Sequence, residues 1–178
     1  MSTLKKYIPH YTVEDYMRWE GDWELIEGTP VAMSPSAGFL HQKVSGAAYT
    51  QLSTTLKRCK NCLSLYEIDW IVSDDTVVRP DIIVICDEPE GDYITKSPEI
   101  VFEIVSKQTA QKDERIKYEI YEKEGVKYYV LVYPELKVAK IFRLESYRFV
   151  KLLDASKEKI EFTLKDCSFI FDFSIIWP

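Results

Sequence analysis

Two acidic residues stand where buried β-strands are expected, and their spacing suggests that they act together. Asp81 opens the apolar run 82–85 in "VVRPDIIVICDEP", and Glu103 interrupts the apolar run "EIVFEIV" 22 positions later. A strand alternates its side chains between two faces, so Glu103 shares a face with Val101 and Val105. Burying an uncompensated carboxylate is costly. We therefore expect a cation close to these acids.

A divalent metal ion is one such cation. If Asp81 and Glu103 lie on neighbouring strands, one of them must take up a proton or move away unless a cation separates them. Mg²⁺ prefers carboxylate oxygens as ligands. Pro80 cannot donate a ladder hydrogen bond, which disturbs the strand and lets the next side chain turn towards a site. Two simpler interpretations stay open: Asp81 as a turn residue that caps nearby amides, and Glu103 in a buried salt bridge, for example with Arg79.

The surrounding sequence predicts a mixed α/β fold that would position these acids. Apolar spacing and caps predict helices after Thr12, over 37–57 and over 110–124. A turn at Glu27-Gly28-Thr29 predicts a first hairpin. Strands are expected over 63–72, 77–86, 99–105 and 126–134, with a hairpin over 137–154 and an apolar stretch over 169–178. The strand–helix–strand unit from 99 to 133 predicts a right-handed crossover and a parallel pair.

Composition and charge narrow the class of protein. A chain of 178 residues suggests one domain over residues 1–178. The net charge of −6 argues against a protein that binds nucleic acid over its whole surface, although a local basic groove stays compatible with it. No segment approaches the ~20 apolar residues of a membrane helix, and "MSTLKKYIPH" has no apolar signal-peptide core. We therefore expect a cytoplasmic protein that does not enter a membrane.

The four cysteines predict little chemistry. Cys59 and Cys62 form a C-x-x-C pair, which suits half a zinc site or a redox pair, but a structural zinc site needs about four ligands. Cys86 and Cys167 lie in apolar, strand-like runs, where free buried thiols are common. We interpret the C-x-x-C spacing as a chance pair.

The ordered motifs resemble a known family. "WELIEGTPVAMSP", "LHQ", "VVRPDIIVI", "VFEIVSKQT" and "DERIKYEIYEKEGVKYYVLVYP" follow one another over roughly residues 10–145. Pro-Asp followed by Glu on a later strand resembles the PD-(D/E)xK nuclease superfamily. The whole set is more similar to its Uma2 (DUF820) family of predicted endonucleases, which is abundant in cyanobacteria. The resemblance implies a restriction-endonuclease-like core, with a mixed central β-sheet flanked by helices.

The resemblance also implies a site and an activity. Asp81, Glu103 and the backbone carbonyl of Ile104 would hold Mg²⁺ or Mn²⁺, which polarises a phosphoryl oxygen and activates water. Glu24 would approach the metal from the first hairpin, and His41 would orient a water, contact a phosphate or hydrogen-bond Glu24. The implied reaction is phosphodiester hydrolysis in nucleic acid, with DNA as the expected substrate. Superfamily members that cut both strands are often dimers, so a homodimer is compatible with this reading.

One residue departs from the superfamily pattern. Its lysine would fall two residues after the acid, at position 105, where this chain has Val105. In Uma2-like sequences the lysine has moved to the next helix, and the matching position is Lys117. This lysine would position the water or stabilise developing negative charge. Periodicity alone does not separate Lys117 from Lys107 and Lys112, so these two stay alternatives.

The residues fit two classes of function. The first is a divalent-metal-dependent endonuclease, favoured by Asp81, Glu103 and Lys117. The second is a catalytically inactive module that keeps the nuclease fold and binds nucleic acid or protein, favoured by the absent lysine at 105 and the acidic charge. A zinc or redox protein built on the C-x-x-C pair has little support.

Overall fold

The computed structural model describes residues 8–33 and 37–178. In these ranges it contains helices and twelve strands, joined by turns and loops. The strands are β1 (Trp23–Ile26), β2 (Thr29–Ala32), β3 (Cys62–Tyr66), β4 (Trp70–Ser73), β5 (Thr76–Val78), β6 (Ile82–Cys86), β7 (Ile100–Ile104), β8 (Tyr128–Tyr133), β9 (Val138–Glu145), β10 (Arg148–Ala155), β11 (Lys159–Thr163) and β12 (Ser168–Asp172). The helices are α1 (Val13–Tyr16), α2 (Phe39–Thr55), η2 (Leu56–Arg58), η3 (Lys112–Lys117), α3 (Tyr118–Lys123), η4 (Pro134–Leu136) and η5 (Phe173–Ile175). No helix in these ranges is both long and apolar enough to cross a membrane. Most of the segment "MSTLKKYIPH", on which the signal-peptide expectation depends, lies outside the described residues.

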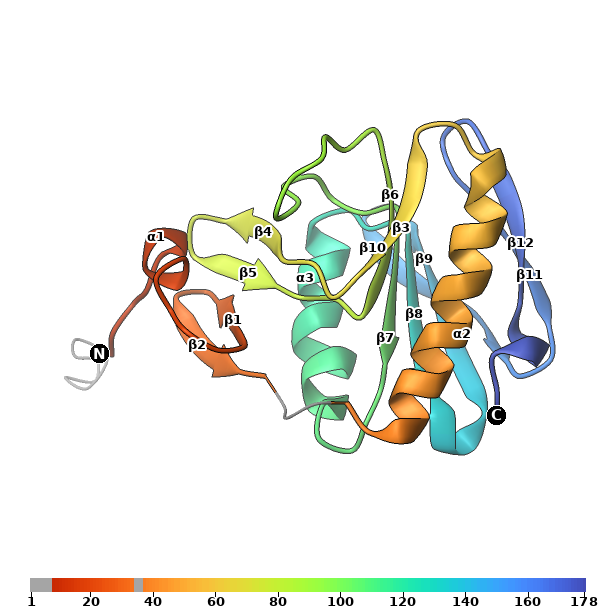
Figure 1. The fold of residues 1–178 in the computed structure, drawn as a ribbon, viewed down its shortest axis with the longest axis horizontal. Coiled ribbons are helices and arrows are strands. Elements are labelled where there is room, and N and C mark those ends of the chain that lie inside the picture. Colours follow the sequence, from red (N-terminus) through yellow and green to blue (C-terminus); the bar gives the residue numbers. More distant parts are fainter. Residues whose placement is uncertain (1–7, 34–36) are drawn as a thin grey trace.

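The largest sheet is mixed, with strand order β10-β9-β8-β7-β6-β3 (Figure 1). Strands β7 and β8 run parallel, as predicted for the unit from 99 to 133, while their outer neighbours pair antiparallel. A second, antiparallel sheet of order β2-β1-β5-β4 lies at the left of Figure 1, and the β11-β12 ribbon lies on the opposite side. The structure therefore confirms the predicted mixed central sheet flanked by helices.

Strand β7 divides the interior into two layers because its side chains alternate. Phe102 belongs to an apolar cluster shared with α2 and the β11-β12 ribbon. Val101 and Val105 belong to a second cluster, shared with Tyr121 of α3. Figure 1 shows α2 and α3 on opposite sides of the central sheet. Glu103 shares the face of Val101 and Val105, as the alternation predicted. This face is turned towards α3, where the Glu103 carboxylate accepts a hydrogen bond from Tyr121.

Two predicted strands are wrong in the same way, since each is two strands that join different sheets. The run 63–72 divides into β3 and β4 after Glu67, whose φ of 50° is left-handed. The run 77–86 divides into β5 and β6 around Pro80, which has no N–H to donate. The break at Pro80 is thus larger than a local disturbance. It leaves Asp81 at the point where the chain passes from one sheet to the other.

All four cysteines form disulfides, so the prediction of free thiols is wrong. Cys59 pairs with Cys167 and Cys62 with Cys86. The second bond joins directly opposed residues of β3 and β6. The partners are 108 and 24 residues apart, so only the tertiary fold brings them together. Cys59 and Cys62 do not pair with each other, which agrees with C-x-x-C as a chance spacing.

Candidate active site

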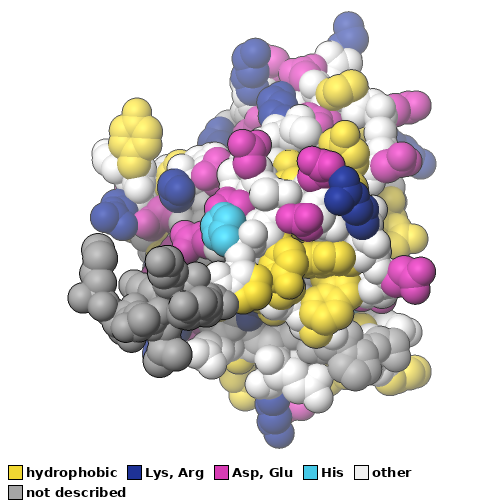
Figure 2. Space-filling view, turned by 90° about the vertical axis from the view of Figure 1, so that its left-hand side faces the viewer, with side chains coloured by type: hydrophobic (Ala, Val, Ile, Leu, Met, Phe, Trp, Pro, Cys, Tyr) yellow, Lys and Arg dark blue, Asp and Glu magenta, His cyan; other side chains and the backbone are white. Residues whose placement is uncertain are grey.

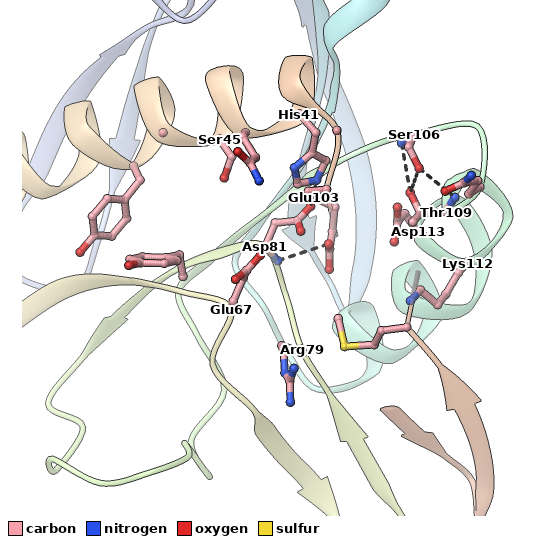
Figure 3. A pocket seen from close by; sticks show the side chains of 18 of the residues that line it. His41, Ser45, Glu67, Arg79, Asp81, Glu103, Ser106, Thr109, Lys112 and Asp113 are labelled. Atoms are coloured by element: carbon pink, nitrogen blue, oxygen red, sulfur yellow. Dashed lines mark hydrogen bonds and ion pairs between the residues drawn. The ribbon is translucent and has the colours of Figure 1, made fainter. Parts of the chain in front are cut away.

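A cavity of about 750 Å³ opens beside the passage from β5 to β6 (Figure 3). Asp81, Glu103 and Lys117 line it, and His41 reaches it from the first turn of α2. Glu24 of β1 lies fully buried against Lys117. The structure therefore brings all five side chains of the predicted site together, although they come from segments far apart in the sequence.

Lys117 bridges two buried carboxylates. Its Nζ lies 2.9 Å from Glu103 Oε1 and 3.0 Å from Glu24 Oε1. It also donates a hydrogen bond of 3.1 Å to the backbone carbonyl of Arg79. Lys112 Nζ lies 2.6 Å from Glu24 Oε2, whereas Lys107 is exposed and does not line the cavity. Among the three candidate lysines, Lys117 is the one in contact with Glu103.

An irregular helix start positions Lys117. The predicted helix over 110–124 is π-helical over η3 and becomes α-helical in α3. Before it, the backbone amides of Ser106 and Thr109 each donate to the other's hydroxyl, at 3.1 and 3.2 Å. Single π-helical turns are frequent at functional sites. Here the π-helical turn carries both Asp113 and Lys117 into the interior.

Only one of the two carboxylate oxygens of Glu103 accepts short hydrogen bonds. Its Oε1 accepts from Lys117 and, at 2.7 Å, from the Tyr121 hydroxyl. Its Oε2 receives only a long contact of 3.4 Å from the Asp81 amide. The simpler interpretation of Glu103 in a buried salt bridge is confirmed, but Arg79 is the wrong partner. Lys117 pairs with Glu103, and the Arg79 guanidinium pairs with Asp69 and Asp22, which directly precede β4 and β1.

Asp81 connects His41 to strand β7. Its Oδ2 accepts a 2.6 Å hydrogen bond from the Ile104 amide and lies 3.3 Å from His41 Nε2. Asp81 thus caps an amide, as the simpler interpretation proposed, and it also faces the cavity. His41 contacts Asp81 rather than Glu24. Figure 3 shows His41, Asp81 and Glu103 directed towards one another.

The cluster carries more negative than positive groups, and their pKa values reflect this. Burial raises the pKa of Glu103 well above its ordinary value, Asp113 and Asp81 add to the rise, and Lys117 opposes it. Burial also opposes ionisation of Glu24, but Lys117 and Lys112 outweigh burial and hold its pKa at about 2. For Lys117, burial disfavours the ammonium, yet the carboxylates led by Glu103 and Glu24 raise its pKa.

At the cavity wall, burial and neighbouring charges also shift the pKa values of His41 and Asp113. Burial disfavours the charged imidazole of His41, but its hydrogen bond to Asp81 and the charge of that carboxylate raise the pKa above the usual value. Burial raises the pKa of Asp113, and Lys117 works against that rise. The proton-binding groups of the cavity therefore influence one another across short distances.

The donor set fits a hard divalent cation. When all four are ionised, the carboxylates of Glu24, Asp81, Glu103 and Asp113 exceed the two ammonium groups of Lys112 and Lys117 by two charges, which a divalent cation would balance. Glu103 Oε2 and Asp81 Oδ1 are left without a strong hydrogen bond from any described residue. The described residues contain no group of three or more His, Cys, Asp or Glu side chains that could hold a metal. A bound ion would therefore depend on these two carboxylates, with backbone or water oxygens completing its shell, which suits Mg²⁺.

The sequence matches the family described as "Putative restriction endonuclease", Uma2, over residues 13–165. The chain belongs to the Uma2 family. A solved structure described as a "putative nuclease belonging to DUF820", from Anabaena variabilis ATCC 29413, resembles it with a TM-score of 0.69 at 17% identity. The match covers 84% of this chain and 88% of that one, and it shows the fold. No curated protein matches the chain.

Sequence reasoning did not assign a role to two buried tyrosines of this Uma2 site. The hydroxyl of Tyr121 donates to Glu103, and that of Tyr129 donates to the backbone carbonyl of Asp113 at 2.8 Å. The available signal was chemical, because a buried tyrosine hydroxyl needs a partner. For Tyr121 the buried acid Glu103 was the natural partner to look for, whereas the backbone carbonyl that Tyr129 reaches left no signal in the sequence.

Proposed function

We propose that this Uma2 protein is a divalent-metal-dependent nuclease that hydrolyses phosphodiester bonds in DNA. The observation that carries the proposal is the shared cavity of Asp81 and Glu103, with Lys117 2.9 Å from Glu103. Family membership supports nuclease chemistry. Metal dependence and the DNA substrate rest on the carboxylate surplus of the cluster and on the resemblance of its residues to the superfamily pattern.

Asp81 and Glu103, with the backbone carbonyl of Ile104, would hold Mg²⁺ or Mn²⁺. The bound ion would supply a Lewis acid for the phosphoryl oxygen and lower the pKa of water. Lys117 would orient the attacking water and stabilise developing negative charge. Glu24 holds the lysine in place from behind, and His41 fixes the orientation of Asp81 through its 3.3 Å contact.

A second candidate is a non-catalytic module that binds nucleic acid or protein. The net charge of −6 favours it, as does the full pairing of Lys117 with two carboxylates. The two candidates differ in whether the cavity turns over a substrate. The homodimer and the cytoplasmic location stay predictions.

Relaxation of a supercoiled plasmid tests the first candidate. We expect nicking in Mg²⁺ or Mn²⁺, none in EDTA, and a loss of about a hundredfold or more for Asp81→Asn and for Glu103→Gln. Glu145→Gln is the matched control, because this carboxylate is surface-exposed and pairs with Arg143 on β9. A folded protein that cuts neither DNA nor RNA, and binds no Mn²⁺ by calorimetry, would favour the non-catalytic module.

A further inference from the structure

Two tyrosines extend the cavity away from the acids. Tyr66, at the end of β3, and Tyr49 of α2 line the same cavity as Asp81. Their rings meet edge to face with centroids 4.8 Å apart. A T-shaped contact covers at most one face of a ring, and Tyr66 is 59% exposed. One face of Tyr66 is thus free to stack on a planar group.

The free ring lies next to the candidate scissile position. Tyr66 is opposite Ile82 in the register of β3 and β6, one residue from Asp81. The amide of Glu67 donates to the Asp81 carbonyl at 3.1 Å, which fixes this register. Gly46 of α2 also lines the cavity, and an added Cβ there would meet nothing within 4 Å. The cavity wall formed by Gly46 is therefore open.

The cations of this cavity are already neutralised by acids of the protein. Lys117 pairs with Glu24 and Glu103, and Lys112 pairs with Glu24. Of the other basic residues that line the described cavity, Arg79 pairs with two further acids and His41 contacts Asp81. On the face shown in Figure 2, which is the left-hand side of Figure 1, acidic side chains are also numerous, with Lys and Arg mainly towards its edges and a hydrophobic patch within it.

The neutralised cations of the cavity favour an unpaired strand over a duplex as its ligand. Duplex binding depends mainly on Lys and Arg contacts to phosphates. The paired cations of the cavity could make such contacts only by giving up Glu24, Glu103 or their other acidic partners. Stacking of an unpaired base on an aromatic ring supplies roughly 1–3 kcal/mol per base and needs no free cation.

We propose that the cavity takes an unpaired strand of DNA, with one base stacked on Tyr66 and the adjoining phosphate beside Asp81 and Glu103. This rests on the proposed nuclease function and specifies its substrate as single-stranded or locally unpaired DNA. Tyr66 is the binding residue, and Tyr49 supports its ring from α2.

Fluorescence anisotropy with an about 12-nucleotide labelled strand and its duplex tests the proposal. The titration is done in Ca²⁺, a hard divalent cation, with oligonucleotide integrity checked on a gel. We expect the single strand to bind at least about fivefold more tightly than the duplex. Tyr66→Ala should weaken single-strand binding by roughly 5- to 100-fold, and Tyr66→Phe, which keeps the ring, should bind like the wild type.

Tyr147→Ala is the matched control, because Tyr147 is 90% exposed in the turn between β9 and β10 and does not line the cavity. Equal affinity for strand and duplex, or unchanged binding by Tyr66→Ala, would overturn the proposal. A loss of equal size in Tyr147→Ala would also overturn it. If the wild type cuts no DNA yet shows the strand preference and the Tyr66 effect, the nuclease proposal fails and the stacking site stands. If it cuts duplex DNA and Tyr66→Ala cuts equally well, the stacking site fails and the nuclease stands.

Discussion

The two faces of strand β7 are equally buried but differ completely in chemistry. On the α2 face, Phe102 packs on Phe162 and Phe171, with ring centroids 6.2 and 5.3 Å apart. On the α3 face, the next residue, Glu103, is 2% exposed and contacts Lys117. Apolar burial stabilises the first face directly. The second face must offset the desolvation of every charge with a partner, and replacing such pairs by apolar residues is often neutral or stabilising.

This contrast shows that burial alone does not distinguish a stabilising interior from a reactive one. The α2 face would tolerate no charge without a partner, and its described cluster consists of apolar and aromatic residues. The α3 face keeps Glu103, Asp113 and Lys117 inside at an energetic cost. We infer that the charged face is maintained for its chemistry, and the following variants test the comparison.

The largest loss of stability is expected when Lys117 is removed from the charged side of β7 or Phe102 from the apolar side. Lys117→Met leaves Glu24 and Glu103 buried without the bridging ammonium and should lower the free energy of unfolding by about 3–5 kcal/mol. Phe102→Ala should cost a similar ~3–5 kcal/mol through the cavity it leaves. Urea unfolding at pH 7 measures both losses.

The two losses should differ in their response to a second substitution. Glu103→Gln added to Lys117→Met removes one orphaned charge and should restore part of the stability. Added to Phe102→Ala, it should restore no stability, because Lys117 is still present there and loses its partner. The same response in both backgrounds would break the distinction between the faces.

A smaller, pH-dependent effect is expected for Glu24. Its pKa of about 2 lies below the ordinary value of 4.5, so ionised Glu24 stabilises the fold above pH 4.5, and this contribution is lost as the pH falls towards 2. Glu24→Gln removes the contribution, which is about 3 kcal/mol at pH 7. The difference between wild type and variant, followed by unfolding at several pH values, should shrink below pH 4.5. A difference that stays constant down to pH 2 would show that the ion pairs of Glu24 do not cause it.

The smallest effect separates two neighbouring hydroxyls on the α3 face. Tyr121 and Tyr129 are both fully buried, with ring centroids 5.1 Å apart, so each Phe variant should lose about 1–2 kcal/mol of stability. Only Tyr121 donates to Glu103. Tyr121→Phe should therefore weaken Mn²⁺ binding in calorimetry by roughly tenfold, while Tyr129→Phe keeps it. Equal weakening in both variants would mean that the hydroxyl of Tyr121 does not orient the carboxylate.

Elements with strong local signals were predictable from the sequence. The capping box of Thr12 and Asp15 starts α1 as predicted, and Glu27-Gly28 forms the turn between β1 and β2. The parallel pair β7–β8 follows from one helical crossover. Each of these depends on contacts within a few residues or within one strand–helix–strand unit. The left-handed Glu67, where the run 63–72 breaks, gave no comparable signal.

The C-terminal region shows where such signals end. Strand β12 lies in the apolar stretch expected over 169–178, but its partner β11 was not predicted. β11 places Phe162 in the core while most of its other side chains are exposed, so its sequence carries little apolar pattern. A strand of this kind is stable only because β12 and the α2 cluster complete it.

The sequence by itself determined which way each side chain of β7 points, because strand geometry sets this locally. It therefore also determined that Glu103 is buried among valines. It indicated a disturbance at Pro80, but not that the chain passes from one sheet to another there. The family resemblance implied Lys117, but the periodicity of the chain did not separate it from Lys107 and Lys112. The tertiary structure decided the partners, since Lys117 reaches Glu103 across 14 residues while Lys112 reaches Glu24 across 88. Partners of buried charges depend on sheet order and on the register of a π-helical turn. Neither the sheet order nor this register can be predicted from the spacing of apolar residues in the sequence.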